Sequence, residues 1–368
     1  MNNIPFFDYP RAYLDDRDAV LKIIDSVASK GAFILQNELA SFENNLANFC
    51  GAKKSIGVAN ATDGLELAWL AVGLQPGDEV ICSSHTMLAT ASAIVTAGGI
   101  PVPVDIRSDG LIDPACVENA ISDRTVGLMP TQLNGRTCDM TTLCDIAERK
   151  GLIIVEDAAQ ALGSRFKGKH AGTFGFASAI SFYPAKVLGS LGDGGAILVN
   201  KKDSYEKLYQ LHDHGRGFDG EVHLWGRNSR LDNIQAAILD YRLGLYNKVI
   251  ARRREIASVY NERLLHIDEI NLPPAPDENG DNYDIYQNYE LQAQKRDDLR
   301  EFLKLAGVGT LVQWGGKAIH QMSNLGFDCS LPVTEKYFRE CLMLPMNTFI
   351  TDDDVHYVCD RIEAFYRS

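Results

Sequence analysis

The sequence contains no uninterrupted apolar run of about eighteen residues, the length that a transmembrane helix requires. Its N-terminal stretch, MNNIPFFDYPRAYLDDRD, is acidic and is interrupted by Pro5 and Pro10. This stretch therefore lacks both the basic start and the apolar core of a signal peptide. From these two absences we expect a cytoplasmic protein with no membrane partner.

Positive charge is also scarce, because 36 Lys and Arg residues stand against 49 Asp and Glu residues, for a net charge of -13. An acidic surface repels nucleic acid, and no basic stretch offers a patch that could follow a phosphate backbone. We interpret the run Arg252–Arg254, which Glu255 follows, as a solvated helix face. We therefore expect no nucleic-acid partner, although local cations could still serve an anionic substrate.

The eight cysteines include no pair with C-x-x-C spacing. Without a secretion signal, a disulfide framework is not expected, and we interpret the cysteines as reduced thiols. Cys138 and Cys144 have no matching pair of histidines nearby, so the sequence predicts no zinc site.

Strand-like and helix-like segments alternate from Leu39, where helical periodicity first appears, to about Asn200. The segments GVAN, VICS, GLMP and IIVE are apolar throughout, as strands buried on both faces are. This alternation predicts an α/β fold with a mostly parallel central sheet sandwiched by helices. Ligands of such sheets bind at the carboxyl ends of the strands.

Beyond about Asn200 the pattern changes to long helices, a Pro-rich break (LPPAPDENGDN) and a strand-like YQNYELQA. We expect a large domain at residues 1–245 and a smaller C-terminal α/β domain at residues 246–368. The helices predicted in this part are Ser204–Asp213, Leu231–Leu265, Asp297–Ala306 and Asp352–Tyr366.

A buried strand, IIVED, ends in two acids and is followed by AAQ. A carboxylate at this end of a parallel strand faces the ligand crevice, which makes Asp157 a candidate functional residue. The ordinary alternative is that Asp157 caps the following helix.

Lys186 follows the apolar and aromatic run AISFYPA and precedes Gly189. Desolvation in such surroundings disfavours the charged form of lysine and leaves a nucleophilic amine. The alternative is a lysine whose aliphatic stem packs while its amine reaches water.

In the segment VANATDGL a strand gives way to a helix, with Thr62 at the junction. The free N–H groups and the dipole of a helix N-terminus can bind a phosphate. The alternative is that Asn60 or Thr62 simply caps the helix.

The glycine-rich segment His212–His223 has few apolar residues, so we predict a mobile loop near the site that extends toward a partner subunit. Arg216 in this loop is a candidate contact for an anionic nucleotide, with an exposed surface role as the alternative.

Taken together, a phosphate-type helix start, a strand-end Asp with Gln three residues later, and a Lys about thirty residues further on resemble the fold-type I enzymes that use pyridoxal 5′-phosphate (PLP). More narrowly, the chain resembles the DegT/DnrJ/EryC1/StrS family of sugar aminotransferases over nearly its whole length. Five collinear motifs carry the resemblance: FENNLANFCGAKKSIGVANATDGLELA, EDAAQALGSRFKGKHAGTFG, SFYPAKVLGSLGDGGAILVN, GRNSRLDNIQAAIL and LPM.

The resemblance implies specific roles around the cofactor. Lys186 matches the lysine that forms the Schiff base with PLP, and Asp157 matches the acid that pairs with the pyridinium nitrogen. Gln160 matches the residue beside the ring oxygen of the cofactor. A buried carboxylate stabilises a protonated ring nitrogen by a charge-assisted hydrogen bond, which agrees with the role of Asp157.

The resemblance also implies how the phosphate is bound. Thr62 and Ser181 match the phosphate-binding hydroxyls, and the backbone of Ala61 lies alongside. Asn228 matches a residue that reaches the phosphate from the other subunit of a dimer, and Arg230 belongs to the same motif. The expected assembly is a homodimer with shared active sites.

Several positions depart from the family pattern. Ala61 stands where the phosphate motif usually has Gly. Met87 stands where the family often has an aromatic residue that stacks on the cofactor ring, and His85, two residues before it, is the alternative for this role. The common loop His-Leu-Tyr-Gly reads QLNG at residues 132–135, and the C-terminal loop VQWGGKAIHQ keeps only its histidine, His320, as a candidate substrate contact. These departures bear on substrate identity rather than on cofactor use.

The family implies an amino transfer from L-glutamate, by way of pyridoxamine 5′-phosphate (PMP), to a nucleotide-linked keto-deoxysugar. We favour a dTDP-4-keto-6-deoxyhexose and 4-amination, for polysaccharide such as O-antigen or for related amino sugars. The alternatives are 3-amination of a 3-keto sugar and a cyclitol acceptor. Dehydratases of the family carry His where this chain has Lys186. PLP-binding regulators of this fold usually carry an added DNA-binding module, and we expect no such module here.

Overall fold

A seven-stranded sheet forms the centre of the protein, whose computed structural model describes residues 3–201 and 204–367. Only β9 runs antiparallel to its two neighbours, so the prediction of a mostly parallel sheet is confirmed. In spatial order the strands are Lys54–Val58 (β1), Gly195–Val199 (β9), Ala177–Ser181 (β8), Ile153–Asp157 (β5), Thr125–Met129 (β4), Glu79–Ser83 (β2) and Ile100–Val104 (β3).

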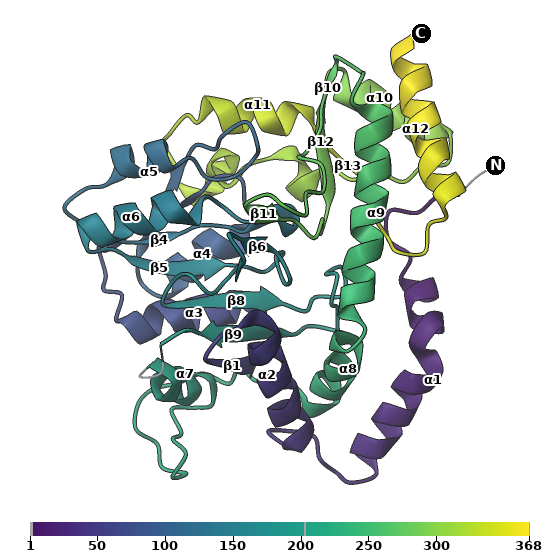
Figure 1. Ribbon diagram of the computed structural model, residues 1–368. Coiled ribbons are helices and arrows are strands. Elements are labelled where there is room, and N and C mark those ends of the chain that lie inside the picture. Colours follow the sequence, from purple (N-terminus) through teal and green to yellow (C-terminus); the bar gives the residue numbers. More distant parts are fainter. Residues whose placement is uncertain (1–2, 202–203, 368) are drawn as a thin grey trace.

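Helices cover both faces of this sheet (Figure 1). Successive side chains of a strand point to opposite faces. In β2, Val80 and Cys82 pack against the helices at residues 61–72 and 88–96, whereas Ile81 packs against the helices at residues 114–120 and 140–150. The helices of this part are Asn37–Cys50 (α2), Ala61–Val72 (α3), Leu88–Thr96 (α4), Pro114–Ala120 (α5), Met140–Lys150 (α6) and Tyr205–His212 (α7).

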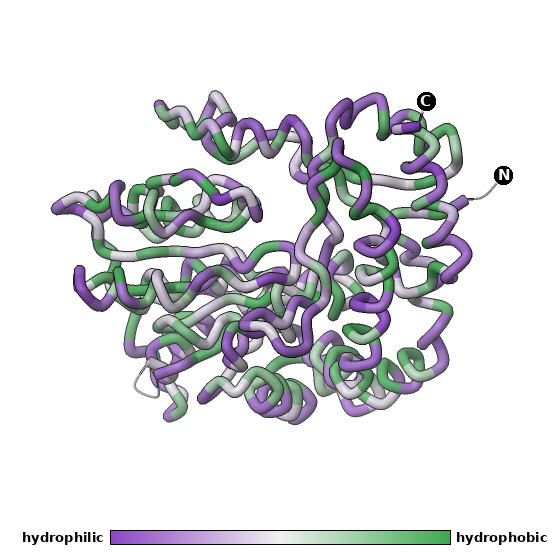
Figure 2. Tube along the Cα trace, turned by 45° about the horizontal axis from the view of Figure 1, so that its top comes forward, coloured by the Kyte–Doolittle hydropathy of each residue, from purple (hydrophilic) through white to green (hydrophobic). Residues whose placement is uncertain are grey.

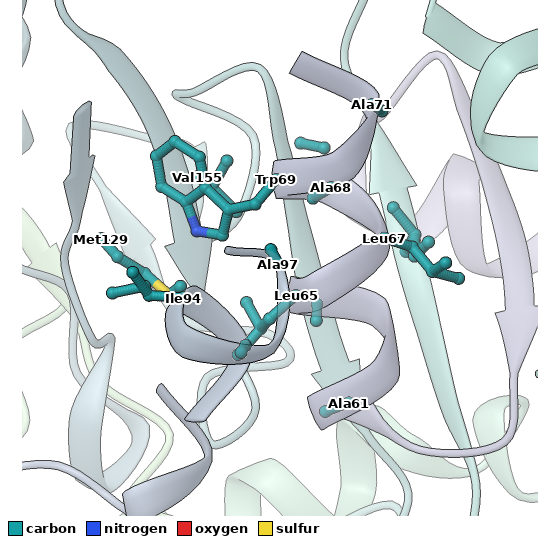
Figure 3. Close-up of a cluster of buried hydrophobic side chains, with 14 of the residues drawn as sticks. Ala61, Leu65, Leu67, Ala68, Trp69, Ala71, Ile94, Ala97, Met129 and Val155 are labelled. Atoms are coloured by element: carbon teal, nitrogen blue, oxygen red, sulfur yellow. The ribbon is translucent and has the colours of Figure 1, made fainter. Parts of the chain in front are cut away.

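Helix α3 is held against the sheet by large side chains. Trp69 is fully buried, and Figure 3 shows it on one side of α3 with Leu67 on the other. A Cβ atom at Gly127 in β4 would lie 2.5 Å from the Trp69 ring, so this glycine makes room for the indole. The packing fixes the direction of α3, whose first residue, Ala61, lies at the carboxyl end of the sheet.

A second, antiparallel sheet of three strands lies in the C-terminal part of the chain. Its strands are Ile270–Asn271 (β10), Tyr289–Ala293 (β12) and Cys341–Leu344 (β13). This second sheet packs in a separate hydrophobic cluster, which consists of residues between 256 and 362 together with Ile4. This separate core supports the division near residue 245, and we propose that two domains meet there.

The remaining elements connect or flank these two parts. Figure 1 shows the long helix Tyr246–Leu264 (α9) running from Asn233–Leu243 (α8), beside the central sheet, to the second sheet, with the two chain ends on that side. These elements are Tyr9–Ala28 (α1), Asn233–Leu243 (α8), Tyr246–Leu264 (α9), Arg296–Leu305 (α10), Pro332–Glu340 (α11), Asp352–Arg367 (α12), and the small sheet of Arg165–Phe166 (β6), Lys169–His170 (β7) and Asn282–Tyr283 (β11).

Two expectations about helices need correction. The predicted helix Leu231–Leu265 is two helices, because α8 ends at Leu243 and α9 begins at Tyr246. The run Arg252–Arg254 is not a solvated face, because Arg253 and Arg254 are buried and their guanidinium groups donate to backbone carbonyls. A buried arginine needs such acceptors, and the sequence pattern of α9 does not reveal them.

Hydrophilic and hydrophobic residues alternate along the helices at the periphery (Figure 2). Within the described ranges, no helix combines the length and the apolar character needed to cross a membrane. All eight cysteines are free.

Candidate functional site

A cavity of about 720 Å³ opens where the parallel strands end. Its wall includes residues two or three positions beyond the ends of β1, β2 and β4, and the last residues of β5 and β8. This is the place where ligands of such sheets bind. The cavity brings together seven residues that the sequence predicted, namely Ala61, Thr62, Met87, Asp157, Gln160, Ser181 and Lys186.

The N-terminus of α3 forms one end of the cavity. Asn60 caps the helix, since its side chain accepts from the N–H of Asp63 at 2.9 Å. A Cβ atom at Gly195 in β9 would lie 2.7 Å from the backbone N of Ala61, so only a glycine allows the helix to approach the sheet so closely. The first N–H groups of a helix have no partner within it. Together with Thr62 and Ser181, they form a cradle for an anion.

Lys186 lies in a turn that the hydrogen bond from its backbone N–H to the carbonyl of Tyr183 closes at 2.8 Å. Burial of its amine within the cavity lowers its pKa to about 8, and the carboxylate of Asp157 acts in the opposite direction. A substantial fraction of the amine is therefore neutral near pH 8, which makes Lys186 a nucleophile and a proton carrier.

Asp157 ends β5 and is 4% exposed. Its Oδ2 accepts from the hydroxyl of Thr90 at 2.6 Å, and its Oδ1 accepts from the N–H of Ala159 at 3.1 Å. Burial raises the pKa of this carboxyl, while the two hydrogen bonds and Lys186 act to lower it. The site thus contains a carboxylate that can pair with a cation in the cavity.

Gln160 is oriented by its neighbours. Its side-chain oxygen accepts from the backbone N–H of Asn134 at 2.9 Å, so its amide nitrogen is the group left to donate. Asn134 has a positive φ of 57° and its Oδ1 accepts from Asn288 at 2.8 Å and from Gln313 at 2.7 Å. The departure from Tyr to Asn in the QLNG loop therefore creates the centre of an amide network that lines the cavity.

Gln287 holds the lysine turn from the C-terminal part of the chain. Its side-chain oxygen accepts from the N–H of Val187 at 3.0 Å, and its amide donates to the carbonyl of Ala185 at 3.0 Å. These two hydrogen bonds bracket Lys186, and we call them the Gln287 clasp. Buried Arg253 fixes the clasp in turn, because it donates to the backbone carbonyl of Gln287. Here the arginine that was expected at the surface positions the candidate catalytic lysine.

Replacing Gln287 with alanine removes both bonds that bracket Lys186. At about 1 kcal/mol each, their loss is expected to lower the turnover number about thirtyfold, with a smaller change in substrate KM. Steady-state kinetics measures this, with Gln292→Ala as the control, because Gln292 donates to the carbonyl of Ser108 outside the cavity. Equal turnover in the two variants would show that the clasp does not position the lysine.

Five candidate residues lie outside the wall of the cavity, and two of them are histidines. The ring of His85 is buried, and its Nδ1 donates to the carbonyl of Gly110 at 2.9 Å. The ring packs edge-on against Trp314, so of the two candidates His85 and Met87 it is Met87 that lines the cavity. His320 is also buried, with its Nε2 3.5 Å from Glu335. Neither histidine faces the space where a ligand of this chain would bind.

Arg216 and Arg230 both bind the buried carboxylate of Asp213, at 3.2 and 3.0 Å. Asn228 is exposed, and its backbone pairs with that of Asp213. None of the three contributes to the cavity wall of its own chain. The loop is better anchored than expected, because Phe218 stacks on Tyr209 with ring centroids 4.4 Å apart.

The model of the DegT/DnrJ/EryC1/StrS aminotransferase family matches residues 15–363. The chain belongs to this family. A pleiotropic regulatory protein of Geobacillus stearothermophilus is 37% identical over 99% of both chains. A dTDP-3-amino-3,4,6-trideoxy-alpha-D-glucose transaminase of Streptomyces venezuelae is 36% identical over 98% of this chain and 96% of its own length.

Solved structures agree with this assignment. The structure of DesV from S. venezuelae, in complex with a ketimine intermediate, has a TM-score of 0.95 and 35% identity, with complete coverage of both chains. NtdA from Bacillus subtilis, with bound PMP, has a TM-score of 0.91 and 27% identity and covers all of this chain and 86% of its own. This member of the aminotransferase family is a PLP-dependent transaminase with the fold-type I architecture.

The residues of the aminotransferase's cavity fit this cofactor. The N-terminus of α3 offers N–H groups that could bind a phosphate. Asp157 is a buried carboxylate that could pair with a protonated ring nitrogen, and Lys186 is an amine of lowered pKa. Among the described residues, no group of three or more His, Cys, Asp or Glu side chains is arranged to hold a metal ion.

The sequence did not single out several residues of the aminotransferase's site. Thr90, Gln287 and Gln313 act through side chains that meet their partners only in the folded protein. The sequence did carry one signal for Trp314, because this residue lies beside two glycines in the divergent loop VQWGGKAIHQ. In the structure Trp314 has a φ of 46°. A bulky residue with positive φ at a cavity wall points to a functional constraint.

Proposed function

We propose that this cavity is the active site of a nucleotide-sugar aminotransferase in which Lys186 and Asp157 carry the chemistry. The presence of an amine with a pKa near 8 and a buried carboxylate in one cavity, beside an open helix N-terminus, carries the proposal. When bound, PLP supplies an electron-withdrawing ring that stabilises negative charge at the substrate carbon.

In this proposal Ala61, Thr62 and Ser181 bind the phosphate, and Asp157 pairs with the ring nitrogen. Gln160 donates from its amide nitrogen to the ring oxygen, consistent with its hydrogen bond from Asn134. Nζ of Lys186 would accept the proton from the donor carbon and later donate it, a role suited to a group with a pKa near 8.

We further propose that each site receives Asn228 from a second copy of the chain, where it reaches the phosphate. Asn228 is exposed, and Trp225, three residues before it, is 99% exposed, so the segment offers an apolar and a polar group to a partner. Arg216 and Arg230, both bound to Asp213, lie on the same segment and are proposed to face the nucleotide of the partner's site. A shared site of this kind supports a homodimer.

L-Glutamate is the proposed amino donor and a nucleotide-linked keto-deoxysugar the acceptor, with a product for polysaccharide or related amino-sugar synthesis. A 4-keto sugar is the acceptor that the sequence favoured. The 3-keto alternative gains support from relatives whose names carry 3-amino or 3-oxo sugars, from Streptomyces venezuelae, Aneurinibacillus thermoaerophilus and Pseudomonas aeruginosa. Transfer in two stages predicts ping-pong kinetics.

An absorbance titration tests the function and the acceptor together. The visible band of the purified protein is expected to fade when L-glutamate is added. It is then expected to return with either a dTDP-4-keto-6-deoxyhexose or a dTDP-3-keto-6-deoxyhexose, and the sugar that restores it faster identifies the carbon that is aminated. Fading without return for both sugars would reject the dTDP-linked acceptors, and a band unaffected by glutamate would reject glutamate as donor.

A second candidate, a PLP-binding regulator, is suggested by the name of the Geobacillus stearothermophilus relative. The net charge of -13 opposes direct DNA binding. A gel-shift assay with genomic fragments is expected to show no complex at physiological salt. A salt-resistant complex together with an absent glutamate response would favour the regulator.

A further inference from the structure

Three threonines form a continuous chain of hydroxyl groups that ends on Asp157. Thr131 donates to Thr86 at 2.8 Å, the hydroxyls of Thr86 and Thr90 lie 2.6 Å apart, and Thr90 donates to Oδ2 of Asp157 at 2.6 Å. Thr86 follows β2, Thr90 lies in the first turn of α4 and Thr131 follows β4, and each is at most 5% exposed. Buried hydroxyls joined in this way are constrained to one pattern of donation.

The carboxylate of Asp157 sets the direction of hydrogen-bond donation along the three hydroxyl groups. An ionised Asp157 can only accept, so the single hydroxyl proton of Thr90 points to it. Thr90 must then accept from Thr86, and Thr86 from Thr131. All three dipoles are therefore aligned toward the negative charge, and each bond polarises the next.

Asp157 depends on such support because few other groups stabilise its charge. Lys186 is the charged side chain of the described residues that acts on it most directly. Glu156, its neighbour in β5, turns the other way and accepts from the N–H groups of Gly172 and Gly175 and from Gln132. The remaining direct donor to Asp157 is the N–H of Ala159.

We propose that Thr90, supported by Thr86 and Thr131, is a positioning residue that keeps Asp157 ionised and fixes its orientation toward the cofactor ring. This inference rests on the proposed function, which places the ring nitrogen beside Asp157. Thr86 and Thr131 also line the cavity, so the chain of hydroxyl groups begins at the cavity wall and ends on the carboxylate of Asp157.

The test measures binding of PMP to the full-length protein, because PMP is not attached to Lys186 and its affinity reports the pairing with Asp157. Thr90→Val removes the hydroxyl and preserves the shape of the side chain. Loss of one hydrogen bond to a charged group is expected to raise the dissociation constant about tenfold.

The pH dependence gives a second readout. PMP binding requires ionised Asp157, so it weakens as the pH falls through the pKa of this carboxyl. Because the Thr90 hydroxyl lowers that pKa and burial raises it, Thr90→Val is expected to move the acid limb to higher pH by about one unit. Thr90→Ser keeps the hydroxyl and is expected to restore the affinity and the acid limb.

Thr86→Val interrupts the chain one bond further from the carboxylate and is expected to have a smaller effect in the same direction. Thr173→Val is the matched control, because Thr173 is also buried and donates at 2.6 Å, but to the carbonyl of His170 outside the cavity. Thermal unfolding of each variant separates a loss of stability from a loss of affinity.

The outcomes separate this inference from the proposed function. If Asp157→Asn weakens PMP binding and Thr90→Val matches the wild type in both readouts, the positioning role is wrong and the cofactor placement stands. If Asp157→Asn itself leaves the affinity unchanged, the ring nitrogen does not lie beside Asp157 and both are wrong.

Discussion

Replacing Lys186 with alanine is expected to abolish transamination. A positioned base contributes about 10²–10⁴-fold to the rate, and loss of the nucleophilic amine removes covalent attachment of the cofactor as well. The variant should show no turnover above background and no visible band from a covalently attached cofactor. Kinetics with L-glutamate and the spectrum of the purified protein measure the two effects.

Lys167→Ala serves as the control, since the amine of Lys167 bonds to Thr141 at the surface. In the wild type, the rate of cofactor attachment should rise with pH and level off above about pH 8, because burial lowers the pKa of the Lys186 amine to about 8 and only the neutral amine is a nucleophile. Turnover of Lys186→Ala within tenfold of the wild type would reject the central assignment.

Replacing Asp157 with alanine is expected to lower the turnover number by about a hundredfold or more. The change removes a charge-assisted hydrogen bond, worth about 1.5–3 kcal/mol, together with the negative charge that would keep the ring nitrogen protonated. The turnover number and the dissociation constant for PMP measure the two consequences.

Asp284→Asn is a suitable control, because Asp284 is also a buried carboxyl but pairs with Arg136 outside the cavity. Thermal unfolding of both variants reports any loss of stability. Near-normal turnover of Asp157→Ala would mean that the cofactor ring lies elsewhere in the cavity.

Most of the central sheet was predictable, because strands buried on both faces are apolar along their whole length. Helix α1 was missed, and it is packed less deeply than the other α-helices, since only Val20 and Val27 of its residues are buried. The break between α8 and α9 was missed although Gly244, the C-cap of α8, is a residue type that often ends a helix. Only Gly244 and Leu245 separate the two helices, so the helical pattern resumes almost at once.

The two central residues of the site were predictable because their signals are local. Asp157 follows an apolar strand directly, and Lys186 stands in an apolar run. The residues that support them could not be found in this way, since Thr90 and Asp157 are 67 residues apart and Gln287 and Ala185 are 102 apart. Threonine and glutamine are common in any position, so only tertiary contacts reveal their roles.

The clasp by Gln287 has a consequence for how the enzyme is made. A ribosome synthesises the lysine turn first and adds Gln287 100 residues after Val187. A nascent chain can thus complete its central sheet while the turn around Lys186 is still held by local bonds alone. We therefore expect the vitamin B6 cofactor to be held stably only after Gln287 has been translated and has reached the lysine turn.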